Sequence, residues 1–362
     1  MTHRSHNFSA GPSPLPLPVL ERVREELLDF GSTGTSILEM SHRSAAYDRV
    51  HNEAIEALSA LLGLTGDHSV LFMGGGARTQ FALLAMNLIP ESGHADYVST
   101  GKWSEIALAE AGKVADVREV WSSKDSGHDH VPAEGAFPAS EGAAYLHLTS
   151  NNTIFGTETL VDPDTGATPL VSDMSSDLLS RPVDVARYGC LYAGAQKNIG
   201  PAGVTVVILR NDLLERARTG LPDILSYRSL ATKNSLLNTP PTFPIYVVGL
   251  VARHLLDLGG LAAAEARARD KAGLLYDVID GSGGFYRGHA QRDSRSRMNV
   301  TFRAPTEALE ARFVEESVAA GMGGLKGHRS VGGLRASIYN NVPTDSVRAL
   351  AEFMADFQRR NG

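Results

Sequence analysis

From about residue 69 to residue 210 the chain alternates short apolar runs with stretches of helical periodicity, and this alternation limits the possible folds more than any other feature. The runs that read as buried strands are SVLFM, DYVST, DVREVW, AAYLHLT, PLVSDMS, GCLYAG and VTVVILR. Helical stretches such as GGGARTQFALLAMNLI and KWSEIALAEAGKV separate them. Strands joined through helices form a mostly parallel sheet covered on both faces. The sequence therefore predicts an α/β fold with its ligand site at the carboxyl ends of the strands.

The flanking segments predict further helices and a second, smaller domain. Helical patterns cover about 18–30, 44–62, 246–258, 261–280, 307–320 and 344–360. The stretches MNVTFRA, LKGHRS and LRASIYN read as strands, whereas residues 220–245 are rich in Pro, Asn, Ser and Thr and are expected to lie outside the core. We therefore expect a large domain over 1–258, which includes an N-terminal substrate-binding segment, and a small α+β domain over 259–362.

Composition and charge argue against several classes of protein. The 362 residues carry a net charge of −7, whereas nucleic-acid binders normally have a basic face. No apolar run reaches the ~20 residues of a membrane helix, and the N-terminus lacks the apolar core of a secretory signal. The single cysteine, Cys190, excludes an internal disulfide framework and a cysteine-based zinc site. We expect a cytoplasmic protein that binds no metal, nucleic acid or membrane.

Lys197 is the strongest candidate for a catalytic residue. It lies in YAGAQKNIGPAGVTVVILR, on a turn rich in Gly, Asn and Pro between two apolar runs. A buried amine whose pKa is lowered can form a Schiff base with an aldehyde cofactor, although most loop lysines are only solvated charges. The assignment therefore depends on partner residues.

Three other features supply such partners. The glycine turn GGGARTQ at 74–80 can bind a phosphate at a helix N-terminus, although a plain strand–helix turn is an equal alternative. Trp103 could stack on a planar cofactor, and Asp173, at a strand end, could pair with a protonated ring nitrogen. A packing role and a helix-capping role are the respective alternatives. Together with Lys197 they match the layout of a pyridoxal-phosphate enzyme.

Two His-Arg pairs and one further arginine point to an anionic substrate. His42 and Arg43 lie early in the chain, and His328, Arg329 and Arg335 lie late. Arginine pairs bidentately with carboxylate or phosphate, which suits a doubly anionic amino acid such as phosphoserine or glutamate. A surface ion pair is the alternative for any single arginine.

Two long motifs carry a resemblance to a known family. These are AGAQKNIGPAG at 193–203 and GHRSVGGLRASIYN at 327–340, and weaker matches extend from about residue 6 to the C-terminus. The chain resembles the phosphoserine aminotransferases, within the class V, fold-type I group of pyridoxal-phosphate enzymes. The resemblance implies a seven-stranded sheet and amino transfer between L-glutamate and 3-phosphohydroxypyruvate in serine biosynthesis. It also allows a phosphorylated hydroxythreonine in pyridoxal phosphate biosynthesis.

The resemblance further implies a role for each matching residue. Lys197 would carry the Schiff base, Asp173 would face the pyridine nitrogen, and Trp103 would stack on the ring. The remaining cofactor contacts would come from Thr153 at the ring hydroxyl and, at the phosphate, from Ala77, Arg78, Gln196, Asn238 and Thr239. Asn238 and Thr239 would belong to a partner chain, so the sites would be shared in a homodimer. Substrate anions would be held by Ser9, His42, Arg43, His328, Arg329 and Arg335.

The sequence also departs from the family pattern, and it leaves rivals open. Ala77 stands where many members have glycine, and Asn152 stands where an acidic residue usually precedes Thr153. A cysteine desulfurase would need an exposed nucleophilic cysteine, but Cys190 is expected to be buried in a strand. A class V aminotransferase for a small keto acid such as glyoxylate is the closer alternative. A cofactor-binding protein without activity is disfavoured, because the lysine, the aspartate and both His-Arg pairs are present.

Overall fold

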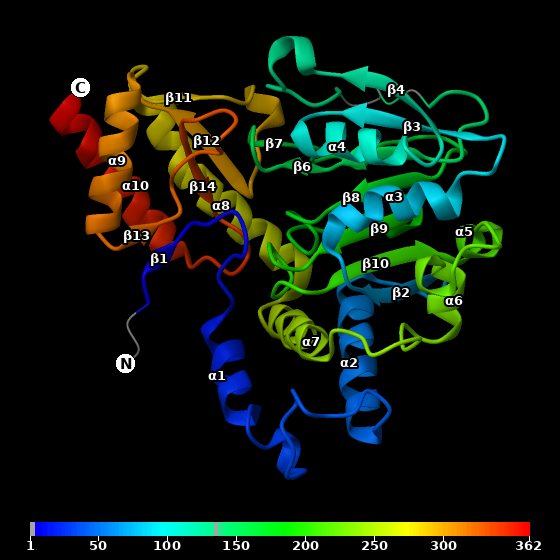
Figure 1. The fold of residues 1–362 in the computed structure, drawn as a ribbon. Coiled ribbons are helices and arrows are strands. Elements are labelled where there is room, and N and C mark those ends of the chain that lie inside the picture. Colours follow the sequence, from blue (N-terminus) through cyan, green and yellow to red (C-terminus); the bar gives the residue numbers. More distant parts are fainter. Residues whose placement is uncertain (1–3, 134–136, 138) are drawn as a thin grey trace.

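A seven-stranded sheet forms the centre of the computed structural model, which describes residues 4–133, 137 and 139–362 (Figure 1). All seven predicted runs form its strands: β2 (His68–Met73), β3 (His94–Ser99), β4 (Asp116–Ser122), β5 (Leu146–Thr149), β8 (Leu170–Asp173), β9 (Tyr188–Gly194) and β10 (Thr205–Arg210). Their order is β2-β10-β9-β8-β5-β3-β4, and only β10 runs antiparallel to its neighbours. The prediction of an α/β fold with a mostly parallel seven-stranded sheet is confirmed.

Helices cover both faces of this sheet. α2 (Ala45–Leu62) and α7 (Thr242–Asp257) pack on one face, and α3 (Gly76–Leu88), α4 (Lys102–Ala111), α5 (Asn211–Arg216) and α6 (Tyr227–Thr232) pack on the other. Successive residues of one strand face opposite sides of the sheet. Val206 and Ile208 therefore pack on the face covered by α2 and α7, and Val207 and Leu209 pack on the other face. Apolar residues therefore run continuously along each strand, as two covered faces require.

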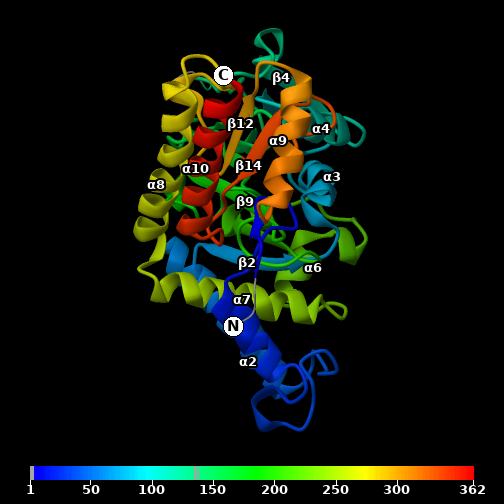
Figure 2. The ribbon, with the colours of Figure 1, turned by 90° about the vertical axis from the view of Figure 1, so that its left-hand side faces the viewer.

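The C-terminal residues build a second core around a three-stranded antiparallel sheet. Its strands are β11 (Arg287–Gly288), β12 (Asn299–Arg303) and β14 (Leu334–Ser337). Figure 2 shows α8 (Gly260–Gly281), α10 (Thr344–Asn361) and α9 (Glu307–Ala319) in front of β12 and β14. Phe302, Phe313 and Phe357 pack edge to face between these layers.

The expected strand LKGHRS is wrong. The strand of this region is β13 (Met322–Gly323), and Lys326 makes only an isolated bridge to Leu334. Gly332 and Gly333 adopt φ values of +70° and +72°, which turns the chain back so that the Gly327 N–H donates to the Gly333 carbonyl. The residues from 326 to 333 therefore form a loop.

The N-terminal segment pairs with the C-terminal core. β1 (His6–Asn7) lies parallel to β13, and the Phe8 side chain is buried among residues of the second core. The chain then enters α1 (Leu17–Glu26), and residues 27–44 extend at the bottom of both ribbon views (Figures 1 and 2). The domain boundary at residue 258 stays a prediction. β1 precedes that boundary in the sequence, but it pairs with a strand of the predicted small domain.

Short elements complete the described fold. A hairpin of β6 (Asn151–Asn152) and β7 (Thr157–Glu158) follows β5, and 3₁₀ turns occur at Phe30–Ser32, Lys124–Ser126, Val185–Arg187, Asp223–Leu225 and Arg292–Ser294. No described helix is by itself both long and apolar enough to cross a membrane; α7 and α8 pass that test only as a pair bent by 84°.

The expectation that residues 220–245 lie outside the core is wrong in part. α6 lies within this stretch, and its Tyr227 is fully buried in the core beside α3. The Tyr227 hydroxyl donates a hydrogen bond of 2.6 Å to the Gln80 side chain. A six-residue helix is too short to show a clear apolar period, so composition alone gave no sign of it.

A buried lysine in the second core predicts a pH effect on stability. Lys271 donates to the carbonyl oxygens of Tyr339 and Val342 at 2.6 and 3.1 Å, and burial, with the nearby Arg267, lowers its pKa to about 7. The unfolded chain therefore binds more protons between pH 7 and the ordinary value of 10.5, so this group makes stability rise with pH there.

We expect the free energy of unfolding of the natural chain to increase by about 2 kcal/mol between pH 7 and pH 9 relative to that of Lys271→Met. Denaturant titrations of both proteins at the two pH values measure this difference. Equal pH dependence of the two proteins would contradict the lowered pKa.

Candidate active site

Five strand ends converge at one edge of the large sheet. β3, β5, β8 and β9 are parallel, and β2 points the same way because antiparallel β10 lies between it and β9. Their carboxyl ends lead into the glycine turn, Trp103, Thr153, Asp173 and Lys197. The alternation of strands and helices thus gathers residues that are far apart in the chain at the edge where such sheets bind ligands.

Lys197 lies on the turn between β9 and β10. The Gly200 N–H closes this turn by donating to the Ala195 carbonyl at 2.8 Å, and the Ser13 N–H donates to the Gln196 carbonyl at 2.9 Å. The Lys197 Nζ lies 5.5 Å from the centre of the Trp103 ring. Burial lowers the pKa of Lys197 and the Arg335 charge adds to this, whereas Asp173 and Asp177 oppose it. The amine is therefore less basic than that of a free lysine, and these two hydrogen bonds fix the turn that carries it.

Asp173 ends β8 with a buried carboxylate. Its Oδ1 accepts hydrogen bonds from the Ser175 N–H at 2.9 Å and from the Ser175 hydroxyl at 2.6 Å. The Gly194 N–H donates to the same Ser175 hydroxyl at 3.0 Å, which links the end of β8 to the end of β9. Among the described residues nothing donates to Oδ2, so this oxygen is free for a ligand. Sequence reasoning missed Ser175, whose only signal was its position in the polar run after the strand.

Trp103, Thr153 and Arg335 form a connected group across the two cores. The indole N–H of Trp103 donates to the Thr153 hydroxyl at 3.2 Å, and Arg335 Nη1 donates to the Thr153 carbonyl at 2.9 Å. Arg335 belongs to β14, so this contact brings a guanidinium from the small sheet to the lysine edge. Its Nε is buried without a hydrogen-bond partner among the described residues, which leaves a donor for an anion.

The glycine turn has the geometry of an anion site. Gly75 and Gly76 have φ values of +89° and +70°, and α3 begins at Gly76, so its first N–H groups are free. A Cβ built on Gly194 would lie 2.9 Å from Gln196 Oε1 and 3.5 Å from the Ala77 nitrogen. Ala77 and Gln196 therefore meet at the end of β9, beside the lysine turn.

The Arg78 side chain points to a different partner. Its Nη2 lies 3.7 Å from Glu110 on α4, and the side chain is 67% exposed. Exposed ion pairs of this kind contribute little, so the useful group of Arg78 at the glycine turn is its backbone N–H.

A pair of substitutions separates backbone from side-chain contributions at this turn. Ala77→Pro removes one N–H at a helix start where proline is otherwise tolerated, and it should weaken cofactor binding at least ~10-fold, as expected for a hydrogen bond to a charged group. Arg78→Ala should change the affinity less than about twofold. Titration of the apoprotein with pyridoxal phosphate measures both. A large loss in Arg78→Ala with none in Ala77→Pro would contradict the assignment.

Asn152, at the position where the resemblance leads us to expect an acidic residue, is buried beside Thr153. Its Nδ2 donates to the Thr100 hydroxyl at 2.7 Å, and its Oδ1 has no hydrogen-bond partner within the described ranges. The Asn152 amide thus connects β6 to Thr100, the residue that follows β3.

The predicted anion-binding residues divide into two groups. His328 and Arg335 line a cavity of about 220 Å³ between the β6–β7 turn and the small sheet. Arg329 is exposed beside it, and Ser9 lies against Gly324, next to the strand of Arg335. Burial and the charges of Arg335 and Arg329 lower the pKa of His328.

The other His-Arg pair lies elsewhere in the single chain. His42 and Arg43 belong to the 27–44 segment, which the ribbon views place away from both sheets (Figures 1 and 2). Arg43 is exposed, and the described residues offer no hydrogen-bond partner to His42 Nε2, which is buried. One chain therefore does not bring this pair to Arg335.

Asn238 and Thr239 are exposed near the glycine turn of the same chain. They line a cavity of about 350 Å³ whose other members include Gly74 and Gly75. Cys190, by contrast, is fully buried in β9, and burial raises the pKa of its thiol. That position confirms the strand prediction for Cys190 and removes the basis for a desulfurase.

Comparisons with known proteins agree along the whole chain. The family model for aminotransferase class-V matches residues 5–350. The chain is 54% identical over 366 residues to the phosphoserine aminotransferase of Desulfatibacillum aliphaticivorans, and the match covers 100% of both chains. The phosphoserine aminotransferase of Geobacillus kaustophilus is 54% identical over 357 residues, 99% of each chain. The solved phosphoserine aminotransferase of Bacillus circulans subsp. alkalophilus has a TM-score of 0.98 at 52% identity, again over 100% of both chains.

Proposed function

Because the chain belongs to the class-V aminotransferases and, within them, to the phosphoserine aminotransferases, we propose that it transfers an amino group between L-glutamate and 3-phosphohydroxypyruvate. The products are 2-oxoglutarate and O-phospho-L-serine, which places the enzyme in serine biosynthesis. The cofactor is pyridoxal 5′-phosphate. The observation that supports an amino-acid or keto-acid substrate is Arg335, which reaches the Thr153 carbonyl at 2.9 Å beside the lysine edge and whose buried Nε has no partner among the described residues.

The residues at the edge fit this cofactor. Free N–H groups at the start of α3 suit its phosphate, and the open Oδ2 of Asp173 suits a protonated ring nitrogen. The Trp103 ring, 5.5 Å from the Lys197 amine, suits a stacked pyridine. Bound there, the cofactor supplies an aldehyde for the lysine and a ring that accepts electrons from the substrate Cα.

The chain's own groups then perform the remaining steps. Lys197, whose pKa burial lowers, takes the proton from the substrate Cα and returns it on the other side of the transferred nitrogen. Asp173 keeps the ring nitrogen protonated through a charge-assisted hydrogen bond. Arg335 binds the α-carboxylate and fixes the Cα–H bond toward the lysine. Ser9 lies on the same side and contributes a hydroxyl to this carboxylate.

Specificity for a second anionic group rests on the His-Arg pairs. His328 and Arg329 bind the phosphate of the keto acid or the γ-carboxylate of glutamate from the small sheet. His42 and Arg43 act on the same group, and we assign them to the other chain of a homodimer because one chain leaves them remote. A small keto acid such as glyoxylate lacks this second anion, so it would leave these cations unpaired.

The two half-reactions test this function. Purified protein mixed with glutamate should lose the visible absorption band of the lysine-bound cofactor. Addition of 3-phosphohydroxypyruvate should restore the band, whereas glyoxylate and pyruvate at equal concentration should restore it at least ~100-fold more slowly, because they lack the second anion that the His-Arg pairs bind. Equal recovery with glyoxylate would favour the alternative class V activity. A phosphorylated hydroxythreonine is a further substrate to test by the same method.

Shared sites in a homodimer have their own test. If Asn238 and Thr239 serve the partner's site, a Lys197→Ala chain and an Asn238→Ala/Thr239→Ala chain should complement each other, because the mixed dimer has one intact site. Co-expression with two tags isolates this dimer, and its activity should approach half that of the natural protein. No recovery would place both residues in their own chain's site, next to Gly74 and Gly75. We further infer a cytoplasmic location, which cell fractionation tests.

A further inference from the structure

The strand that carries Arg335 is attached to the large sheet at both of its ends. At one end Arg335 Nη1 donates to the Thr153 carbonyl at 2.9 Å, and at the other Asn340 contacts the residues that follow β8 and β9. Between them the Ile338 N–H donates to the Met298 carbonyl, which holds the segment against β12. The position of Arg335 relative to Lys197 therefore depends on both attachments.

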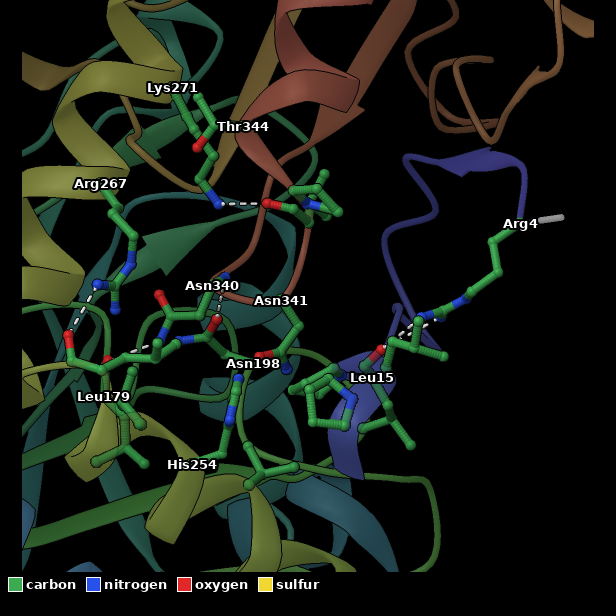
Figure 3. Close-up of a pocket in the computed structure, with 18 residues that line it drawn as sticks. Arg4, Leu15, Leu179, Asn198, His254, Arg267, Lys271, Asn340, Asn341 and Thr344 are labelled. Carbon is green, nitrogen blue, oxygen red and sulfur yellow. Dashed lines mark hydrogen bonds between the residues drawn. The ribbon is translucent and has the colours of Figure 1, made fainter. Parts of the chain in front are cut away.

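Two asparagine side chains form the second attachment (Figure 3). Asn198, the residue after Lys197, accepts the Asn340 N–H at its Oδ1 at 2.9 Å and donates from Nδ2 to the Leu178 carbonyl at 2.6 Å. Asn340 Nδ2 donates to the Leu179 carbonyl at 2.7 Å. Asn198 is 1% exposed and Asn340 is half-buried, so the bond from Asn198 to the Leu178 carbonyl is protected from water. One short network thus joins the lysine turn, the turn after β8 and the end of the Arg335 strand.

The backbone at this junction adopts a conformation that needs such support. Leu179 has a φ of +64°, a region that residues with a Cβ rarely occupy, and its side chain is buried. Conformations of this kind persist where surrounding bonds fix them, and they concentrate at functional sites. The two carbonyls that receive the asparagine amides belong to Leu179 and its predecessor.

We propose that Asn198 and Asn340 are positioning residues, which hold the carboxylate-binding arginine of the small sheet in register with the lysine of the large sheet. They touch neither substrate nor cofactor. Asn340 acts through Arg335, and Asn198 connects it to the turn of Lys197. This inference rests on the proposed role of Arg335 as the carboxylate-binding residue.

A double-mutant cycle between Asn340 and Arg335 tests the proposal. Asn340→Ala should raise the KM for glutamate about 10-fold, the effect of one lost hydrogen bond, and leave kcat within about threefold. In an Arg335→Ala background the same change should add nothing to the KM, because the arginine it positions is absent. Equal effects in both backgrounds would overturn the proposal. The natural protein's response to glutamate reports separately on the proposed function.

A buried asparagine far from the site is the matched control. Asn87 donates to the Leu83 and Leu225 carbonyls at 2.9 and 2.8 Å and is fully buried. Asn87→Ala should lower the melting temperature as Asn340→Ala does, but it should leave the KM for glutamate unchanged. If Asn340→Ala does not fold, Asn340→Ser keeps a small polar group there and supplies the same cycle. A rise in KM for Asn87→Ala equal to that for the Asn340 variant would also overturn the proposal.

Discussion

Replacement of Lys197 by alanine is expected to reduce turnover by at least ~10⁴-fold, since a positioned general base alone supplies up to about that factor. The same variant should lack the visible band of the lysine-bound cofactor, because it removes the amine that lies 5.5 Å from the centre of the Trp103 ring. Pyridoxal phosphate should still bind, since the glycine turn and Asp173 are intact. Absorption spectra and the glutamate half-reaction measure both effects.

Lys271 provides the matched control for this experiment. It is also a buried lysine with a pKa lowered by burial, but it lies in the second core and donates to the Tyr339 and Val342 carbonyls. Lys271→Met should keep the absorption band. Turnover of Lys197→Ala near that of the natural protein, or loss of the band in Lys271→Met alone, would contradict the assignment of the reactive lysine.

Replacement of Asp173 by asparagine is expected to lower kcat about 100-fold or more. The amide has no charge to hold a proton on the ring nitrogen, and loss of such a charge-assisted pair costs about 3 kcal/mol. The amide keeps the size of the carboxylate, and its oxygen can still accept the Ser175 bonds. Cofactor content should therefore fall less than activity does, as absorption and single-turnover measurements will show.

Asp177 offers a second buried carboxylate for comparison. Burial and the nearby Glu158 charge raise its pKa to about 7, so at neutral pH it is about half protonated, and the Ser150 hydroxyl donates to it at 2.5 Å. Asp177→Asn should change kcat less than about tenfold, because removal of a group that is half neutral changes the local charge little. A loss equal to that of Asp173→Asn would contradict a role specific to Asp173, because a carboxylate that does not face the ring nitrogen would then matter as much.

Much of the fold follows from local patterns in the sequence. The apolar runs that became β2 and β10 are long and uninterrupted, and the Ser44 hydroxyl and Gly63 mark the two ends of α2 through capping. Where the signal was short the prediction failed. The stretch LKGHRS belongs to a loop that turns back at Gly332 and Gly333, and the six residues of α6 include the buried Tyr227. Local periodicity cannot report on elements of one or two turns.

The candidate site was predictable as a set of residues but not as a geometry. The local sequence singled out Lys197, Asp173 and Arg335 and the resemblance gave each a role, whereas the bonds that support them depend on contacts across long distances in the chain. Ser175 bridges the ends of β8 and β9, and Asn340 reaches Leu179 from 161 positions away. Only the tertiary structure shows that the segment with His42 and Arg43 lies away from Arg335 in one chain. None of these contacts has a periodic or compositional signature.

The parallel pairing of β1 with β13 has a consequence for synthesis of the chain. Residues 6 and 7 leave the ribosome long before their partners Met322 and Gly323, so the strand must wait while the residues between them are made. Non-local pairing of this kind is slow, and unpaired strands favour aggregation in the meantime. Because Ser9 follows directly and lies against Gly324, the substrate side of the site is assembled last, after the lysine edge has folded.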